Sequence, residues 1–535
     1  MYNNYIIKSS LINGGRSSNP GDANGASGEQ VDDEVAKTRD FYVNTLGWDF
    51  DNTWTFFEGT EGKAYPVLKT MKAPVATVIF DMPNDETLTY ENEYSYMEMD
   101  NMHASWGQPL SFEIVEGGDY AEFEDGYLYA GKGGVFNGEG DVVIKVNLDP
   151  AVADKYNVVG GNTFTIYVAQ SGAVKKIATV EDFLNIGKNL GGKYELTADI
   201  DLRHVTFGGF ATNGKEFTGE LDGKGHKVIA LSVSGTGGTD FGVFGKTMGA
   251  TIKNIAFEDF RIINQSANHV GFVGSAQSTV FDQVGLNGMV WGNDHVAVLA
   301  GDADDVTVTN CMVYGYVYAY SQVGGFFGCT LATGANVQNS YFNGELNAYT
   351  RGWVGGVVGL IDKAGGTVTI EHCASIGDCH SFGDGSPHVV APFIGGNRAG
   401  GDNPEEWNII NFHDNIYNAT AIMDGDTDWP INRLTADGGD VEAAVGVSAE
   451  ALKQESTYTD LGWDFQNIWH MGNEAYPWPV LKNAKMDPVL GIKNVDSDAA
   501  RSFTSGKTYN IMGQQVDGTV VKGIVIRDGR KFIVK

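Results

Sequence analysis

Phe241-Gly242-Val243-Phe244-Gly245 opens a series of six similar segments in which glycine flanks apolar residues. When Gly245 is taken as the last position of the first copy, the later copies end at Gly274, Ala300, Gly328, Gly359 and Gly395. The steps between these positions are 29, 26, 28, 31 and 36 residues. A period of this size is typical of stacked structural units. The sequence therefore predicts a repeat architecture for the middle of the chain.

Each unit also contains a segment in which apolar and polar residues alternate, such as Ile252-Lys253-Asn254 and Val337-Gln338-Asn339. Alternation of this kind predicts a strand that buries one face. The glycines allow sharp turns and close approach of one backbone to the next. Short strands joined by glycine turns predict the rungs of a parallel β-helix, because helical repeats need longer segments of 3.6-residue period.

Two further segments precede the repeats, Tyr194-Glu195-Leu196-Thr197-Ala198-Asp199-Ile200-Asp201-Leu202 and Phe217-Thr218-Gly219-Glu220-Leu221-Asp222-Gly223-Lys224-Gly225-His226. Together with the glycine repeats they resemble the GLUG-motif proteins over residues 175–485. The resemblance implies a right-handed parallel β-helix on a secreted or surface-attached bacterial protein. That family carries no single activity, so the resemblance transfers no catalytic residue.

The sequence predicts four parts in an all-β chain. Residues 72–172 contain short alternating runs separated by turns rich in Gly, Asp and Asn, which predict an immunoglobulin-like β-sandwich. Residues 173–486 are the predicted GLUG β-helix, and the apolar spacing within 180–187 predicts a short helix that caps its first rung. Residues 487–535 are predicted to form a small C-terminal β domain.

The C-terminal part resembles the sorting domains of secreted Bacteroidota proteins. The resemblance rests on Tyr509-Asn510-Ile511-Met512-Gly513-Gln514-Gln515-Val516 and on residues 522–535, which end in a basic tail. Val525 stands where those domains usually have tyrosine. The resemblance implies export by a type IX-like secretion system; the alternative is a plain β-hairpin module.

One unit of sequence occurs twice. Leu46-Gly47-Trp48-Asp49-Phe50 recurs as Leu461-Gly462-Trp463-Asp464-Phe465, and a tryptophan and a Tyr-Pro segment follow each copy. The second copy closes the predicted β-helix. We therefore expect residues 1–71 to be the tail of an upstream β-helix array and the chain to be a fragment of a longer protein; the alternative is a short autonomous cap.

Composition excludes several classes of protein. The chain has 535 residues and a net charge of −32, which disfavours binding to nucleic acid. Its apolar runs fall short of the roughly 20 residues needed to span a bilayer. Four cysteines in a chain of this length are too few for a disulfide framework, so we expect small buried side chains. A secreted or cell-surface location is expected from the resemblances.

No specific catalytic or metal-binding motif is evident, and the catalytic residues are left unassigned. His372, His380, His388 and His413, with Asp378, Asp384 and Asp414, could meet on the last rungs as an acid/base or metal site, although polar loops are the simpler explanation. A calcium ion is conceivable at Asp302, Asp304 and Asp305, and no other cofactor is expected.

Aromatic residues give the strongest candidate for binding. Tyr314, Tyr316, Tyr318 and Tyr320 alternate along one strand and so share a face. Alignment of the rungs places Trp291 beside Tyr318 and Tyr320 beside Tyr349. Stacked rings could bind sugars, which makes Trp291, Tyr316, Tyr318, Tyr320 and Tyr349 the candidate carbohydrate-binding residues; the alternative is ordinary cross-strand packing.

These observations favour adhesion, or binding of a glycan or host surface, along the wall of the β-helix. The alternative is a carbohydrate-active enzyme, such as a polysaccharide lyase or glycoside hydrolase. That function requires two or three carboxylates, or a base and a cation site, to converge in one groove.

Overall fold

The computed structural model divides the chain into two units, Met1–Ala173 and Val174–Lys535. It describes residues 5–7, 11–12, 15–16, 29–56, 61–62, 65–70, 76–81, 86–99, 103–105, 107, 109–153, 156–212, 214–350, 352–362, 366–382, 388–397, 408–425, 427, 442–483, 508–510, 515–516, 523–527 and 530–534. Among these residues, no helix has both the length and the apolar character needed to cross a bilayer.

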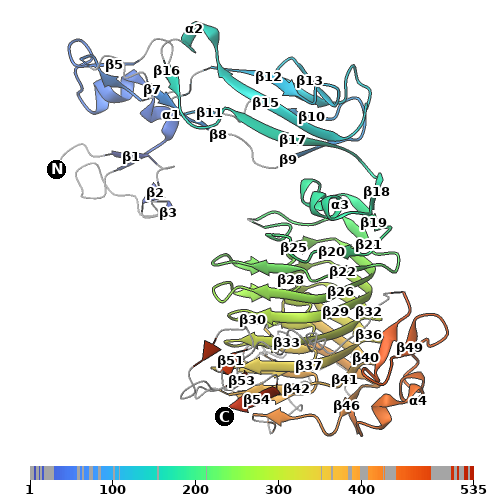
Figure 1. The fold of residues 1–535 in the computed structure, drawn as a ribbon. Coiled ribbons are helices and arrows are strands. Elements are labelled where there is room, and N and C mark those ends of the chain that lie inside the picture. The colour runs from blue at the N-terminus through green and yellow to red at the C-terminus, as the bar shows by residue number, and fades with distance from the viewer. Residues whose placement is uncertain are drawn as a thin grey trace. The chain divides into compact units, whose positions relative to one another are not determined.

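The repeats form a parallel β-solenoid, so the predicted all-β architecture is confirmed (Figure 1). Six successive rungs each contribute one short strand to a first six-stranded sheet and the next strand to a second. The rest of each rung joins a 19-stranded sheet that begins with β18 (Val174–Ile177) and ends with β48 (Val445–Val447). Pairing between rungs is parallel in all three sheets.

The strands of the two smaller sheets have the following bounds. The first sheet contains β24 (Asp240–Phe241), β27 (His269–Val270), β30 (His295–Ala297), β34 (Val323–Gly324), β38 (Gly352–Gly355) and β43 (His388–Ala391). The second contains β25 (Phe244–Met248), β28 (Val273–Gln277), β31 (Ala300–Asp304), β35 (Phe327–Thr330), β39 (Val358–Ile361) and β44 (Ile394–Asn397). Each glycine repeat joins a strand of the first sheet to the following strand of the second.

The apolar residues of the repeats fill the interior of the solenoid. Phe244, Val273, Ala300 and Phe327 are paired in register on successive rungs, and all four are fully buried. This register corrects the alignment of the third copy. Ala300 pairs with Val273, so Gly301 is the residue equivalent to Gly274.

The large sheet bends at a polar corner in each rung. Asn254, Asn310 and Asn339 occupy this corner with φ between 48° and 53°, the left-handed region that asparagine tolerates better than most residues. Asn310 separates β32 (Val306–Thr309) from β33 (Met312–Ala319). The recurring asparagine of the alternating segments is therefore a bend in the strand.

Both ends of the solenoid carry a helical element. The predicted N-terminal helix is present as α3 (Val180–Leu184), where Thr179 and Asp182 form a capping box. At the other end, residues 448–482 form a module with η5 (Ala451–Lys453), α4 (Glu455–Thr459) and the antiparallel pair β49 (Trp469–Met471) and β50 (Pro479–Leu481). We call residues 448–482 the C-terminal module.

The C-terminal module packs against the outer face of the large sheet. Tyr341 on β37 (Tyr341–Ala348) donates a hydrogen bond to the carbonyl of Pro479 at 2.6 Å and lies 2.9 Å from the hydroxyl of Tyr476. The indole of Trp463 donates to the carbonyl of His372 at 2.7 Å. Trp463 is 3% exposed, so the aromatic face of the module is almost completely covered.

The first copy of the duplicated sequence has the same local fold. Its elements are α1 (Asp33–Ala36), the π-helix η1 (Phe41–Thr45), and the antiparallel pair β5 (Trp54–Thr55) and β6 (Val67–Leu68). The first copy has one residue more than the second copy between the preceding strand and the first tryptophan, and the wider turn of the π-helix accommodates it. We call residues 29–69 the N-terminal module.

Ring geometry shows how closely the two modules agree. The centroids of Trp48 and Trp54 are 4.1 Å apart, against 4.6 Å for Trp463 and Trp469. In the N-terminal module, however, Trp48 is only partly buried. The strands before the modules also match, since β1 (Tyr5–Ile7) pairs in parallel with β4 (Glu29–Val31) as β46 (Ile416–Asn418) pairs with β48. The assignment of residues 1–71 to the tail of an upstream array stays a prediction.

Strands between residues 76 and 170 form a separate β core. The largest sheet has the order β12-β15-β17-β9, with β12 (Leu110–Glu116), β15 (Gly140–Leu148), β17 (Thr163–Gln170) and β9 (Glu86–Tyr90). A three-stranded sheet contributes to the same apolar cluster. Its immunoglobulin-like character stays a prediction.

Two remaining expectations concern the C-terminus and the cysteines. The described strands after residue 507 form an antiparallel sheet with the order β52-β51-β53-β54: β52 (Gln515–Val516), β51 (Thr508–Asn510), β53 (Gly523–Arg527) and β54 (Arg530–Val534). Half of the Tyr509–Val516 segment lies outside the described residues, and the sorting role stays a prediction. Cys311, Cys329, Cys373 and Cys379 are all buried, as expected, and are not joined in disulfides.

Candidate functional site

The glycine repeat brings polar side chains of neighbouring rungs together at the junction of the two smaller sheets. Gly301 begins this contact, because its backbone lies against the preceding rung. A Cβ atom at position 301 would lie 2.5 Å from the backbone nitrogen of Val270 and 2.8 Å from the carbonyl carbon of His269. Only glycine permits this approach. The residue after Gly301 is Asp302, which is thereby held beside His269.

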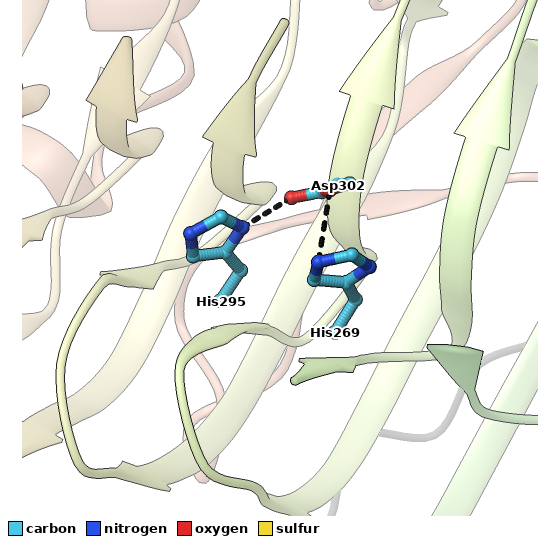
Figure 2. Close-up of side chains that lie close together, drawn as sticks. All are labelled: His269, His295 and Asp302. Atoms are coloured by element: carbon cyan, nitrogen blue, oxygen red, sulfur yellow. Dashed lines mark hydrogen bonds and ion pairs between the residues drawn. The ribbon is translucent and has the colours of Figure 1, made fainter. Parts of the chain in front are cut away.

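His269, His295 and Asp302 form one cluster, which we call the His–Asp cluster (Figure 2). His269 and His295 are paired in register on β27 and β30, and their rings stack at 5.1 Å with 17° between the planes. Asp302 lies between them, with Oδ1 2.6 Å from Nδ1 of His295 and Oδ2 3.3 Å from Nε2 of His269. The carboxylate therefore bridges two rungs.

Two more carboxylates face the outer nitrogens of the histidines. Asp240, one rung before His269, accepts a hydrogen bond from its Nδ1 at 2.6 Å. Asp294 lies 3.7 Å from Nε2 of His295. The side chain of Asp302 is 6% exposed and those of His269 and His295 are 20% and 16% exposed. The cluster is therefore largely buried, and its two histidines keep partial contact with solvent.

The electrostatics of the cluster favour a positive charge. Burial acts to lower the pKa of His269, but its hydrogen bond to Asp240 and the negative charges of Asp302 and Asp240 outweigh that effect, so its pKa is raised. A buried carboxylate such as Asp302 is costly unless a cation or a hydrogen-bond donor compensates it. The two histidines provide that compensation in the protein alone.

The His–Asp cluster is not among the sites predicted from the sequence. Of its three members, only Asp302 belongs to a predicted site, the conceivable calcium site. The sequence nevertheless carries a signal for this cluster. The residue just before the repeat is polar in four successive copies: Asp240, His269, His295 and Gln322. Such a column of polar residues next to a buried apolar position indicates a ladder that faces one side of the solenoid.

The three predicted calcium ligands make contacts with different parts of the protein. Asp304 accepts a hydrogen bond from the backbone nitrogen of Thr333 at 2.7 Å, and Asp305 accepts one from the hydroxyl of Ser278 at 2.8 Å. Asp302 belongs to the His–Asp cluster. Calcium binding by these three residues stays a prediction.

The later histidines are distributed over separate pairs. His372 lies 3.3 Å from Asp414, His380 lies 3.9 Å from Asp424 and stacks on Phe382, and His388 lies 3.4 Å from Ser381. Asp384 lies outside the described residues. In the described part of the chain, three potential metal ligands come together in the His–Asp cluster and not among these later histidines.

The structure brings the predicted aromatic residues together in two groups. Trp291 is paired in register with Tyr318, with ring centroids 6.4 Å apart, and both side chains are partly buried. Tyr320 and Tyr349 make an edge-to-face contact at 6.2 Å and are 39% and 44% exposed. Tyr316 is partly buried. Their role in carbohydrate binding stays a prediction.

The aromatic face is shorter than the alternation suggests. Tyr314 is 4% exposed because Tyr476 of the C-terminal module covers it, with ring centroids 5.6 Å apart. Burial raises the pKa of the Tyr318 hydroxyl. The free aromatic surface is therefore at the Tyr320 end of the strand.

Comparison with known proteins gives limited similarity, and no family model matches the chain. Halomucin of Haloquadratum walsbyi is 29% identical over 144 residues, which cover 24% of this chain and 2% of halomucin. A "putative immunoglobulin A1 protease" from Bacteroides ovatus has a TM-score of 0.46 at 18% identity and covers 59% of this chain and 94% of its own. A structure described as IgA1 protease has a TM-score of 0.35 at 16% identity, covering 63% of this chain and 27% of its own.

Proposed function

We propose that this protein is secreted or displayed on the cell surface and binds glycans or a host surface through the outer wall of its β-solenoid. The observation that carries the proposal is the exposed pair Tyr320 and Tyr349 on adjacent rungs. Aromatic rings offer an apolar face and a polar edge, which together suit the alternating surfaces of a sugar. The partly buried pair Trp291 and Tyr318 extends this aromatic area along the wall.

The location follows from the same proposal. The repeats and the C-terminal segment resemble secreted and surface-attached proteins, and the net charge of −32 favours solubility. Treatment of intact cells of the source bacterium with an added protease should degrade the protein. Full resistance on intact cells, together with cleavage after lysis, would contradict the proposed location.

The aromatic wall can be tested with two substitutions. Tyr320→Ala combined with Tyr349→Ala should weaken glycan binding about tenfold, since aromatic contacts contribute roughly 0.5–1.5 kcal/mol each and 1.4 kcal/mol is a factor of ten. Binding would be measured by a glycan array and then by titration with the best ligand.

Two controls separate stacking from other effects. Tyr320→Phe combined with Tyr349→Phe keeps both rings and should retain most of the affinity. Tyr94→Ala removes a tyrosine that is 73% exposed outside the solenoid and should leave binding unchanged. Equal glycan profiles for wild type and the double alanine variant would count against the wall as the binding surface.

A further inference from the structure

We propose that His269, His295 and Asp302 bind a first-row divalent cation, and that Zn²⁺ is the ion that fits them best. Two imidazole nitrogens and one carboxylate oxygen are a donor set that zinc accepts. The ligating atoms of the three side chains all lie within 4.8 Å of one another. This proposal does not depend on glycan binding.

The orientation of His269 supports this assignment. Its Nδ1 donates to Asp240, so Nε2, which faces Asp302, is the nitrogen that can bind a cation after it loses its proton. Metal-bound histidines commonly donate their other ring nitrogen to a carboxylate, which fixes the tautomer and the ring orientation. In His295 the nitrogen that faces Asp302 is Nδ1, while Nε2 points towards Asp294. Both rings therefore present one nitrogen to the carboxylate of Asp302.

The two contacts of the Asp302 carboxylate, through Oδ2 to His269 and through Oδ1 to His295, require only a small adjustment. In a tetrahedral zinc site with bonds of about 2.0–2.1 Å, neighbouring ligand atoms are separated by about 3.3 Å. The contact between Asp302 and His269 is already 3.3 Å. The contact between Asp302 and His295 is 2.6 Å and would lengthen by under about 1 Å when a cation replaces the shared proton.

A second observation concerns the next rung. Gln322 directly follows His295 in register, because Val296 pairs with Val323. It is 5% exposed, and its Oε1 has no hydrogen-bond partner among the described residues. A buried amide oxygen without a partner is unusual. Gln322 therefore extends the column of polar side chains by one rung, on the side of His295 opposite His269, with an amide oxygen that lacks a partner among the described residues.

Charge gives a third reason. Asp240, Asp294 and Asp302 surround the two imidazoles, so the group has a formal charge of −3 when both histidines are neutral. A divalent cation offsets most of this charge. The partly exposed edges of His269 and His295 leave a path by which the ion can enter.

The test is metal binding by the full chain after removal of metal with a chelator. Titration with Zn²⁺ by calorimetry should show one site of micromolar or tighter affinity, and Co²⁺ should give the visible absorption of a four-coordinate complex. Asp302→Asn and His295→Gln should each weaken binding by at least a hundredfold. Asp240→Asn, which only releases the ring of His269, should weaken it by about tenfold to a hundredfold.

A matched control exists on another rung. His226 lies 2.9 Å from Asp199 in a simple pair, so His226→Gln should leave the affinity unchanged. If hydrogen exchange shows that Asp302→Asn alters the fold, the His269→Gln variant is used in its place. The proposal is overturned if wild type binds neither ion, or if the cluster variants bind as tightly as wild type.

Discussion

Replacing Trp463 with alanine should lower the free energy of unfolding of the solenoid unit by about 3–5 kcal/mol, the range for large aromatic side chains removed from a core. Trp463 is 3% exposed and packs against Tyr341 and Trp469, at 6.2 Å and 4.6 Å between ring centroids. Its loss also leaves the carbonyl of His372 without the indole hydrogen bond. Denaturant unfolding followed by circular dichroism, with hydrogen exchange on the strand of Tyr341, would measure the effect.

The chain provides its own control for this substitution. Trp48 occupies the equivalent position of the N-terminal module and stacks on Trp54, but it is only partly buried. Trp48→Ala should therefore cost less than half as much as Trp463→Ala. Equal losses would show that the stability of the C-terminal module arises within the module and not from its contact with the solenoid.

Replacing Gly301 with alanine should destabilise the solenoid by roughly 3 kcal/mol or more, at the upper end of what overpacking causes. The added Cβ would lie 2.5 Å from Val270 N and 2.7 Å from Gly274 O, and both are backbone atoms that no rotamer change can move. The neighbouring rungs would have to separate, which would weaken the ladder between β28 and β31. Hydrogen exchange of these strands should rise, and metal binding should fall with it.

A neutral glycine substitution tests the cause. A Cβ atom added at Gly208 would have no atom within 4 Å apart from those of its chain neighbours, and the φ of Gly208 is not in the left-handed region. Gly208→Ala should change stability by less than about 0.5 kcal/mol, as for ordinary surface substitutions. If Gly301→Ala were equally mild, the close approach of the rungs would not be needed for the fold.

The repeat architecture could be predicted because period and alternation are local properties of the sequence. The pairing of Trp291 with Tyr318 likewise followed from aligning one rung with the next. The burial of Tyr314 could not be predicted, because its cover is Tyr476, which lies in a module far along the chain. Contacts of that kind depend on how a terminal segment folds back, and the repeat pattern carries no information about it.

The His–Asp cluster was missed for a different reason. Its two histidines are 26 residues apart, which equals the step of the alignment on Ala300, so that alignment already places them in register. The misplaced member is Asp302. The third repeat had been aligned on Ala300, one residue away from its true equivalent, Gly301. A shift of one residue moves every side chain of a strand to the opposite face. In that alignment Asp302 does not fall beside the histidines.

The duplicated module has a consequence for how such proteins grow. A solenoid rung exposes unpaired backbone groups at its end, which invites association with other strands. Here a strand pair such as β46 and β48 leads directly into a module that folds against the wall, and the same order recurs with β1, β4 and the N-terminal module. The parallel strand pair and the module that follows it thus recur together as one structural unit. Duplication of such a unit within a gene would repeat the strands together with the module that follows them.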